Sequence, residues 1–463
     1  MMLKRIFFLI QPLLLFAGLS CAQNNLNDAG WNKLDEILNQ IVEPTFASNE
    51  FDITTYGAVG DGLTDCSEAI KKAIDECSAA DGGKVVIPEG TFLTGPIYLK
   101  SNVNLYLSEN SIIKFSKDKS KYLPVVFTRW EGVECMNYSP LIYSYQEVNI
   151  AITGKGILDG QGSDQNWWSW KGNKESGWTE GLPNQKKDRD NLFEMAENNV
   201  PPEERVFGEG HYLRPSFVQP YRCKNILIEG VTLKNSPMWF IHPVLCENVT
   251  IKNVTVEGLG PNNDGCDPES SKNILIKNCY FNTGDDCIAI KSGRNNDGRR
   301  IDIPSENIVV QDCKMKEGHG SVVIGSEISG GAKNIFAENC VMNSPNLDRA
   351  IRIKTNAVRG GLIEDVYVRN ITVGQVKEAV IKINFYYEEG ANGNFLPVVR
   401  NLDFSNITSE KSEYAIWIKA FDNSPVTNIR FYDCVFENVE KQNLIENVDS
   451  MEIKNLIIND KEL

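Results

Sequence analysis

From residue 225 onward, one pattern of apolar and polar positions recurs along the chain. Each copy opens with Asn or Asp, carries apolar residues one and three places later in nearly every case, and usually has Asn or Asp at the fifth place. Apolar residues at alternate positions are typical of a β-strand. The eight copies are NILIEGVTL, NVTIKNVTV, NILIKNCYF, NIVVQDCKM, NIFAENCVM, DVYVRNITV, NLDFSNITS and NIRFYDCVF, which begin at positions 225, 248, 273, 307, 334, 365, 401 and 428.

The spacing of these copies indicates a solenoid, because they begin 23 to 36 residues apart. Short strands separated by Asn-containing turns, without a helical period between them, predict an all-β parallel β-helix in which equivalent residues of successive coils stack. The Asn positions should then form side-chain ladders at the bends. Leucine-rich and helical solenoids fit poorly, since the segments between copies show no 3.6-residue period.

Before the repeat, the pattern predicts one amphipathic helix that starts after an N-cap at Asp65 and runs to about Ala80. Its apolar face is made by Ala69, Ile70, Ala73, Ile74 and Cys77. A helix in this place could cover the open hydrophobic end of a β-helix. We therefore predict a β-helix domain over residues 49–463 with an N-terminal capping helix, preceded by a linker or short leading helix at residues 23–48.

Residues 161–210 interrupt the coil pattern with a long polar segment. A loop of this length inside a compact fold is usually functional. It carries four tryptophans, Trp167, Trp168, Trp170 and Trp178. Their rings could stack on sugar faces or pack against one another within the loop, and the sequence leaves both interpretations open.

The first 22 residues are typical of an export signal, with Lys4 and Arg5 followed by an apolar run over residues 6–19 and the small residues of GLSCAQ. This run is too short for a membrane span, and no second run of about 18 apolar residues follows it. Cleavage before Cys21 would leave a lipid-bearing cysteine, whereas ordinary cleavage would follow Ala22. We expect an exported protein without a transmembrane span, in the periplasm or associated with the outer membrane of a bacterium as a lipoprotein.

The formal net charge of −15 argues against a nucleic-acid partner, because binding of phosphates depends on Lys and Arg. An acidic substrate remains compatible with a local group of basic residues that are close in sequence. These are Lys291, Arg294, Arg299, Arg300, Arg349, Arg352 and Lys354.

Twelve cysteines in an exported chain would ordinarily suggest disulfides. Four of them, however, occupy the sixth place of the repeat, where sister copies have Val or Ile, so we interpret them as small buried hydrophobic residues. The four are Cys279, Cys313, Cys340 and Cys434. The spacing typical of zinc ligands is absent, and Cys66 with Cys77 and Cys266 with Cys287 remain candidates for isolated disulfides.

Six charged or ionisable residues fall at similar places in consecutive copies, near the turn into the second strand. Asp264 lies 16 residues after Asn248, Asp285 and Asp286 lie 12 and 13 after Asn273, His319 lies 12 after Asn307, and Arg352 and Lys354 lie 18 and 20 after Asn334. Coils about 4.8 Å apart would bring them together. Neighbouring carboxylates raise one another's pKa values, and hydrolysis of a glycosidic bond needs one protonated and one ionised carboxyl. Each aspartate alone is an ordinary turn residue, but their shared place favours a catalytic site.

Four segments that contain these residues, GPNNDGCDPES, TGDDCIAIKSG, GHGSVVIGSE and RIKT, resemble in sequence and order the signature segments of glycoside hydrolase family 28, the polygalacturonases. The resemblance covers roughly residues 50–460 and includes the opening YGAVGDGLTD. It implies a right-handed, single-stranded parallel β-helix. It also implies inverting hydrolysis of α-1,4-galacturonosyl linkages in polygalacturonate, the acidic polysaccharide of pectin, without a cofactor or metal.

The same resemblance implies the catalytic roles. Asp285 would be the general acid, and Asp264 and Asp286 would jointly activate water. His319 would tune the protonation of Asp285.

Substrate binding is implied in the same way. Arg352 and Lys354 would bind the galacturonate carboxylate, which is a planar acceptor suited to an Arg fork. Asn262 would also contact the substrate, together with Tyr387 or, as the less favoured choice, Tyr386.

Two features favour action at chain ends, so that monomer would be released. Asn263 stands where threonine is usual, a form associated with exo-acting bacterial members, and the insertion at 161–210 could close one end of the cleft. Three alternatives remain: a hydrolase of rhamnogalacturonan or xylogalacturonan, a calcium-dependent pectate lyase, and a non-catalytic glycan-binding β-helix. We expect a monomer with a pH optimum on the acidic side of neutral.

Overall fold

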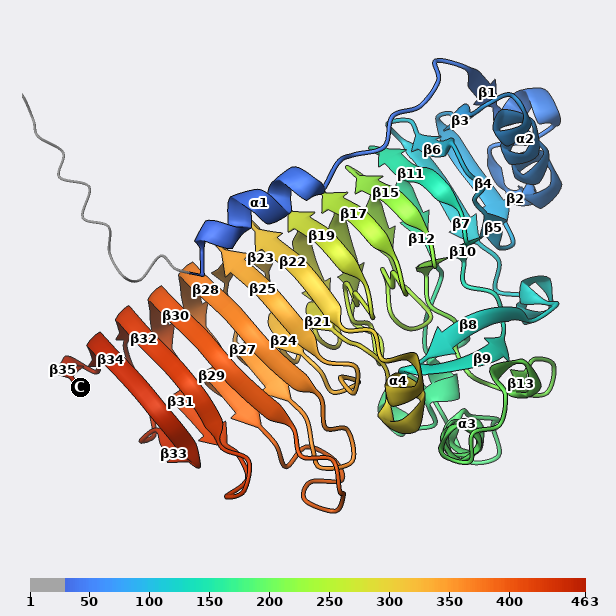
Figure 1. The fold of residues 1–463 in the computed structure, drawn as a ribbon. Coiled ribbons are helices and arrows are strands. Elements are labelled where there is room, and N and C mark those ends of the chain that lie inside the picture. The colour runs from blue at the N-terminus through green and yellow to red at the C-terminus, as the bar shows by residue number, and fades with distance from the viewer. Residues whose placement is uncertain (1–29) are drawn as a thin grey trace, which may run out of the picture.

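The computed structural model describes residues 30–463, which form a right-handed parallel β-helix whose coils stack from one end of the molecule to the other (Figure 1). The predicted export signal and Cys21 lie outside the described residues. Each coil contributes strands to three rows that run along the stack. Within residues 30–463, no helix is long and apolar enough to cross a membrane.

The first two rows belong to one large sheet. The first row consists of β1 (Glu50–Asp52), β3 (Gly83–Ile87), β6 (Val103–Leu107), β11 (Val148–Gly154), β15 (Lys224–Glu229), β17 (Glu247–Lys252), β19 (Lys272–Lys277), β22 (Ser305–Gln311), β25 (Ala332–Glu338), β28 (Leu362–Gln375), β30 (Val398–Lys411), β32 (Val426–Phe436) and β34 (Val448–Ile458). The second row consists of β2 (Asp61–Asp65), β4 (Gly90–Thr94), β7 (Ser111–Phe115), β12 (Ile157–Asp159), β16 (Thr232–Lys234), β18 (Thr255–Gly258), β20 (Tyr280–Thr283), β23 (Lys314–Met315) and β26 (Val341–Met342), and joins the first at β28. The short strand β35 (Lys461–Glu462) pairs antiparallel with β34.

The third row carries the residues of interest for function. It begins with β5 (Ile97–Tyr98), β10 (Ile142–Tyr145) and β14 (Val218–Tyr221), continues through single-residue bridges at Ile241 and Cys266, and ends with β21 (Ile288–Ile290), β24 (Val322–Ile324), β27 (Arg349–Lys354), β29 (Ala379–Asn384), β31 (Tyr414–Lys419) and β33 (Leu444–Glu446).

The predicted asparagine ladders are present at the bends. The opening residues of all eight copies have a left-handed backbone, with φ between 53° and 62°, which Asn and Asp tolerate better than most residues. Their amides bond from coil to coil, for example from Asn248 Nδ2 to Asn225 Oδ1 at 2.7 Å and from Asn307 Nδ2 to Asn273 Oδ1 at 2.9 Å. The repeat therefore specifies both the bend and the stacking.

The cysteines of the described chain behave as the repeat predicts. All eleven cysteines in residues 30–463 are buried and unbridged, including the four at the sixth place of the repeat. Cys66 with Cys77 and Cys266 with Cys287, the two candidate disulfides, are free thiols in this structure.

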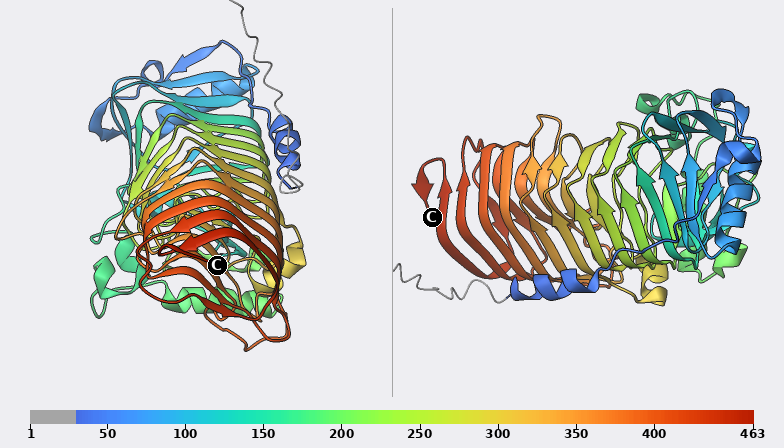
Figure 2. Two further views of the ribbon diagram at one scale, coloured as in Figure 1. Left: turned by 90° about the vertical axis from the view of Figure 1, so that its left-hand side faces the viewer. Right: turned by 90° about the horizontal axis from the view of Figure 1, so that it is seen from above.

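Two N-terminal helices pack on the β-helix. Helix α2 (Ser67–Ala79) lies at the N-terminal end of the stack and buries the five apolar residues that the sequence predicted (Figure 1). It begins after Cys66, while Asp65 Oδ1 accepts a hydrogen bond from the Ser67 N–H at 3.0 Å. Helix α1 (Asn32–Gln40), within the segment predicted as a linker or leading helix, lies along the outside of the stack (Figure 2). Residues 30–40 are therefore packed structure.

Several segments leave the coils beside the third row. An antiparallel hairpin of β8 (Val126–Trp130) and β9 (Val133–Asn137) precedes the insertion, which contains α3 (Lys186–Glu197) and β13 (Val206–Phe207), and α4 (Asn295–Ile301) follows later. The short 3-10 helices are η2 (Ile53–Tyr56), η3 (Lys119–Tyr122), η4 (Trp168–Lys171), η5 (Lys174–Ser176) and η6 (Pro202–Glu204).

Two of the four tryptophans of the insertion belong to a buried aromatic cluster. Trp167 and Trp170 are buried, with ring centroids 5.1 Å apart, and their rings also contact Tyr122 and Tyr212. Of the two interpretations that the sequence left open, the structure therefore supports a self-packed loop.

Candidate active site

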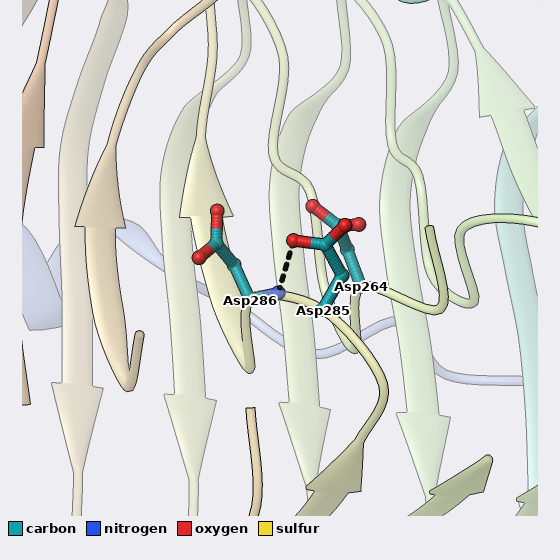
Figure 3. Close-up of side chains that lie close together, drawn as sticks. All are labelled: Asp264, Asp285 and Asp286. Carbon is teal, nitrogen blue, oxygen red and sulfur yellow. Dashed lines mark hydrogen bonds between the residues drawn. The ribbon is translucent and has the colours of Figure 1, made fainter. Parts of the chain in front are cut away.

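The third strand row brings the predicted carboxylates together. Asp264 precedes the bridge at Cys266, and Asp285 and Asp286 stand in the turn before β21. One oxygen of each of these three side chains lies within 4.8 Å of the others. Asp264 and Asp285 face one another, whereas the Asp286 side chain points away from them (Figure 3).

His319, in the turn before β24, pairs with Asp285. Its Nδ1 lies 2.9 Å from Asp285 Oδ1, which also accepts from the Asp286 N–H at 3.0 Å. The hydrogen bond and charge of Asp285 raise the pKa of His319 to about 9. Burial alone would raise the pKa of Asp285, but the hydrogen bond and charge of His319 outweigh it and hold that pKa below its ordinary range. In the free protein, the proton of this pair therefore resides on His319.

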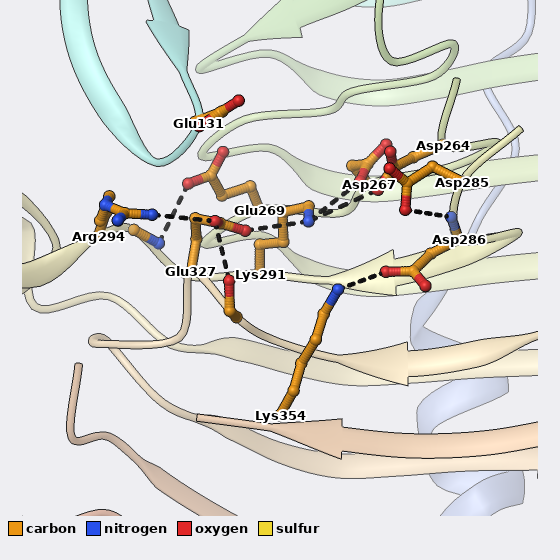
Figure 4. Close-up of polar contacts among 12 residues, drawn as sticks. Glu131, Asp264, Asp267, Glu269, Asp285, Asp286, Lys291, Arg294, Glu327 and Lys354 are labelled. Atoms are coloured by element: carbon orange, nitrogen blue, oxygen red, sulfur yellow. Dashed lines mark hydrogen bonds and ion pairs between the residues drawn. The ribbon is translucent and has the colours of Figure 1, made fainter. Parts of the chain in front are cut away.

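Asp264 has a buried neighbour that the sequence interpretation overlooked, Asp267. Burial raises the pKa values of both carboxyls well above the ordinary range, and for Asp264 the charges of Asp267 and Asp285 add to this effect. Lys291 Nζ lies 3.7 Å from Asp264, 3.5 Å from Asp267 and 3.1 Å from Glu327 (Figure 4). The two aspartates behave as a pair that retains a proton. The resemblance predicts a protonated Asp285 and an ionised Asp264. In the free protein, Asp285 is ionised and the Asp264–Asp267 pair carries the proton.

Arg352 and Lys354 lie on strand β27 itself rather than in the turn before it, and both face Asp286. Lys354 Nζ donates to Asp286 Oδ2 at 2.7 Å, while Arg352 Nη1 lies 3.7 Å from Asp286 Oδ1. The ring centroid of Tyr387 is 5.4 Å from the Arg352 guanidinium carbon and 5.3 Å from Lys354 Nζ. In the free protein, the two cations expected to bind substrate are therefore already balanced in part by Asp286.

Four carboxylate oxygens in this cluster are buried and have no hydrogen-bond donor among residues 30–463: both oxygens of Asp267, Asp264 Oδ1 and Asp286 Oδ1. A buried acceptor without a donor is unfavourable. Among the three aspartates predicted to be catalytic, Asp264 and Asp286 therefore each have one oxygen that could accept a hydrogen from a water molecule.

A cavity of about 420 Å³ is lined by Asp264, Asp285, Lys291, His319, Arg352 and Lys354, whereas Asp267 and Asp286 are fully buried. Its other walls come from the segments outside the coils: Glu131 from the β8–β9 turn, Lys171 and Arg189 from the insertion, and Tyr387 and Glu388 from the loop after β29. Tyr387 is thus the tyrosine in the cavity, since Tyr386 packs on Phe421 with ring centroids 4.9 Å apart.

The two asparagines before Asp264 have different surroundings: one faces the cavity and the other is buried in the turn. Asn262, which is predicted to contact the substrate, lines the cavity. Asn263 is fully buried and donates to the carbonyl oxygens of Ser236 at 3.0 Å and Met238 at 2.9 Å, so it holds the turn that presents Asp264.

Three carboxylate oxygens at this spacing are also the ligand type that Mg²⁺ and Ca²⁺ prefer. Here the ammonium groups of Lys291 and Lys354 contact the same carboxylates. The chain itself therefore supplies positive charge at the place where a cation would be expected.

Paired carboxyls in a cavity on the flank of a parallel β-helix are the groups that hydrolysis of a glycosidic bond requires, and they point to the class of glycoside hydrolases. A family model described as "Glycosyl hydrolases family 28" matches residues 208–454, and one described as "Rhamnogalacturonase A/epimerase, pectate lyase-like" matches residues 51–119. The chain belongs to glycosyl hydrolases family 28. This membership sets aside the lyase and the non-catalytic alternatives.

Similar proteins agree with this family. A solved exopolygalacturonase from Thermotoga maritima is 49% identical, covers 94% of this chain and 97% of its own, and superposes with a TM-score of 0.91. A probable polygalacturonase of Vitis vinifera is 29% identical over 81% of this chain and 72% of its own length. An exo-poly-alpha-D-galacturonosidase of Dickeya chrysanthemi is 29% identical over 78% of this chain and 62% of its own length.

Proposed function

We propose that the protein hydrolyses α-1,4-galacturonosyl linkages of polygalacturonate from the ends of the chain. The observation that carries the mode of action is the closed end of the cavity. Arg189 of the insertion lies 2.7 Å from Glu131 of the β8–β9 turn and 4.0 Å from Glu388 of the loop after β29. A polymer that threaded past this end would have to separate these ion pairs, so a chain terminus is the better fit. The names of the exo-acting relatives support the same mode.

In the proposed reaction, Asp264 and Asp286 bind the attacking water through their unpaired oxygens and receive its proton. Asp285 is the acid, because it is the partly exposed member of the three aspartates, whereas Asp264 and Asp286 are buried. The proton resides on His319 until the leaving oxygen approaches Asp285, and it then passes along the 2.9 Å hydrogen bond to Asp285 and to the sugar. One water is consumed: its hydroxyl joins the anomeric carbon, and the proton from His319 joins the leaving oxygen. The proton received by Asp264 and Asp286 must return through solvent to His319 before the next turnover.

Product analysis tests this proposal. Polygalacturonate should yield galacturonate monomer from the earliest time point, and NMR should show the β-anomer first if the reaction inverts. The anomer is informative because the carboxylate oxygens lie within 4.8 Å of one another, closer than the roughly 6.5–9.5 Å usual for inverting pairs. Mixed oligomers would contradict end-wise action, and faster cleavage of rhamnogalacturonan would indicate a different pectic substrate.

The role of Asp267 leads to a prediction about pH. In the proposed mechanism the proton of the Asp264–Asp267 pair rests on Asp267, which leaves Asp264 free to act as base. Asp267→Asn is neutral at every pH, as the protonated Asp267 is, so the acid limb of log kcat/KM against pH should stay in place. A shift of that limb to lower pH would mean that Asp267 is ionised in the wild type and that its charge raises the pKa of Asp264. If the alkaline limb moves instead, Asp264 is the proton donor and the assignment of Asp285 is wrong.

We propose that the protein is exported and acts as a monomer on an acidic polysaccharide. The support is the pattern of residues 1–22, which offers cleavage either before Cys21 or after Ala22. The mass of the mature N-terminus would distinguish a lipid-modified Cys21 from ordinary cleavage, and the uncleaved chain would contradict export.

A further inference from the structure

Two cations at the insertion side of the cavity converge on a single neutral atom. Lys171 Nζ and Arg214 Nη2 each donate to Asn262 Oδ1 at 2.7 Å. Lys171 is the last residue of η4 in the insertion, and Arg214 follows the insertion on the chain. The amide oxygen of Asn262 carries no charge that could balance the two cations.

Neither cation has a carboxylate within 4.0 Å in the described chain. Arg214 is fully buried, and its other hydrogen bonds go to neutral oxygens, at Gln185 Oε1, Pro237 O and Pro261 O. Other cations of the cavity differ in this respect, since Arg189, Lys291 and Lys354 each have a carboxylate within 3.1 Å. A buried charge without a counter-ion is unfavourable.

The pKa values of Lys171 and Arg214 agree with an excess of positive charge in this part of the cavity. Burial lowers the pKa of Lys171, and it lowers the pKa of Arg214 to about 10. A bound anion in this corner would offset the cost of both charges.

We propose that Lys171, Arg214 and Asn262 form a second carboxylate site, which binds the galacturonate unit at the closed end of the cavity. This inference rests on the proposed function. Lys171 contacts the carboxylate directly, because its ammonium has three donors and only one is used on Asn262. Arg214 is a positioning residue that acts through Asn262 and through its charge. Arg352 and Lys354 bind the carboxylate of the unit on the other side of the cleaved bond.

The two sites can be told apart with digalacturonate and its two monomethyl esters, each of which neutralises one carboxylate. The wild type should cleave both esters with a kcat/KM about 10- to 100-fold below that of the free acid, the effect expected from loss of one charge-assisted hydrogen bond. Lys171→Met should remove the penalty for one ester and keep the penalty for the other. Arg352→Gln should show the opposite selectivity.

Three controls separate recognition from folding. Lys171→Arg should keep much of the preference for the free acid, because it preserves the charge. Lys174→Met removes an exposed lysine three residues further along the same insertion and should retain both penalties. The thermal unfolding midpoints of Lys171→Met, Lys171→Arg and Lys174→Met should be no lower than that of the wild type.

The outcomes are distinct. A Lys171→Met variant that keeps both penalties, or loses both equally, overturns this second site while leaving the proposed function intact. A wild-type protein that cleaves none of the three disaccharides and does not act on polygalacturonate overturns the proposed function and this inference together.

Discussion

Asp285→Asn should lower kcat on polygalacturonate by roughly 10²- to 10⁴-fold, the range that a positioned general acid contributes. The amide cannot donate the proton that His319 passes along the 2.9 Å contact, but it has nearly the same shape as the carboxyl. Release of reducing ends at pH 5 to 6 measures the effect, and titration of the substrate with the inactive variant should show that binding persists.

The chain offers a matched control in Asp433, which occupies an asparagine place of the repeat. It has a left-handed backbone and accepts from Asn455 Nδ2 at 2.7 Å, as an asparagine in a ladder would. Asp433→Asn should leave kcat unchanged. Activity of Asp285→Asn within about 10-fold of the wild type would show that another group supplies the proton.

Lys354→Met should lower the free energy of unfolding by roughly 3–5 kcal/mol, because it leaves the fully buried Asp286 without its closest cation. Denaturant unfolding at pH 7 measures this change. The double variant with Asp286→Asn should recover part of the loss, since it removes the unpaired charge as well.

Lys419 provides the comparison, because it stands in register with Lys354 two strands further along the same row. It pairs with Glu446 at 3.4 Å, and both side chains are substantially exposed. Lys419→Met should cost no more than about 1 kcal/mol. Equal costs for the two lysines would mean that burial of Asp286 does not determine the stability of the site.

The coil architecture and the candidate catalytic cluster could be predicted from the sequence because both follow from the repeat. Equivalent places in successive copies stack, so residues far apart in the chain, such as Asp264 and His319, could be assigned to one surface by counting from the opening Asn. The interpretation of the cysteines as buried hydrophobic residues followed from the same alignment of copies.

The closed end of the cavity could not be predicted in this way, because it is made by segments outside the repeat. Glu131, Lys171 and Arg189 have no counterparts in the coils, so no count of positions could place them. For the four tryptophans of the insertion, the sequence left sugar stacking and packing within the loop both open, and in the structure two of them are buried in that segment. Asp267 could have been predicted as a site residue, since it lies three residues after Asp264 in the same motif.

The protonation states of the site residues could not be predicted from the residue types alone. The pKa values of Asp264 and Asp285 move in opposite directions because one carboxyl is buried beside another acid and the other is paired with His319. Which partner each would have depends on side-chain directions within the turns, and the repeat does not specify these directions.

Helix α1 contacts four consecutive coils of the first row through apolar side chains. The contacted residues are Leu275, Val309, Phe336 and Tyr367. The same four coils carry, on the third row, Asp285 with Asp286, then His319, then Arg352 with Lys354, and then Tyr387. The apolar contacts of the helix therefore add to the strand pairing and the asparagine hydrogen bonds that hold these four coils together. In this way the helix helps to maintain the spacing between the groups that the four coils present at the site.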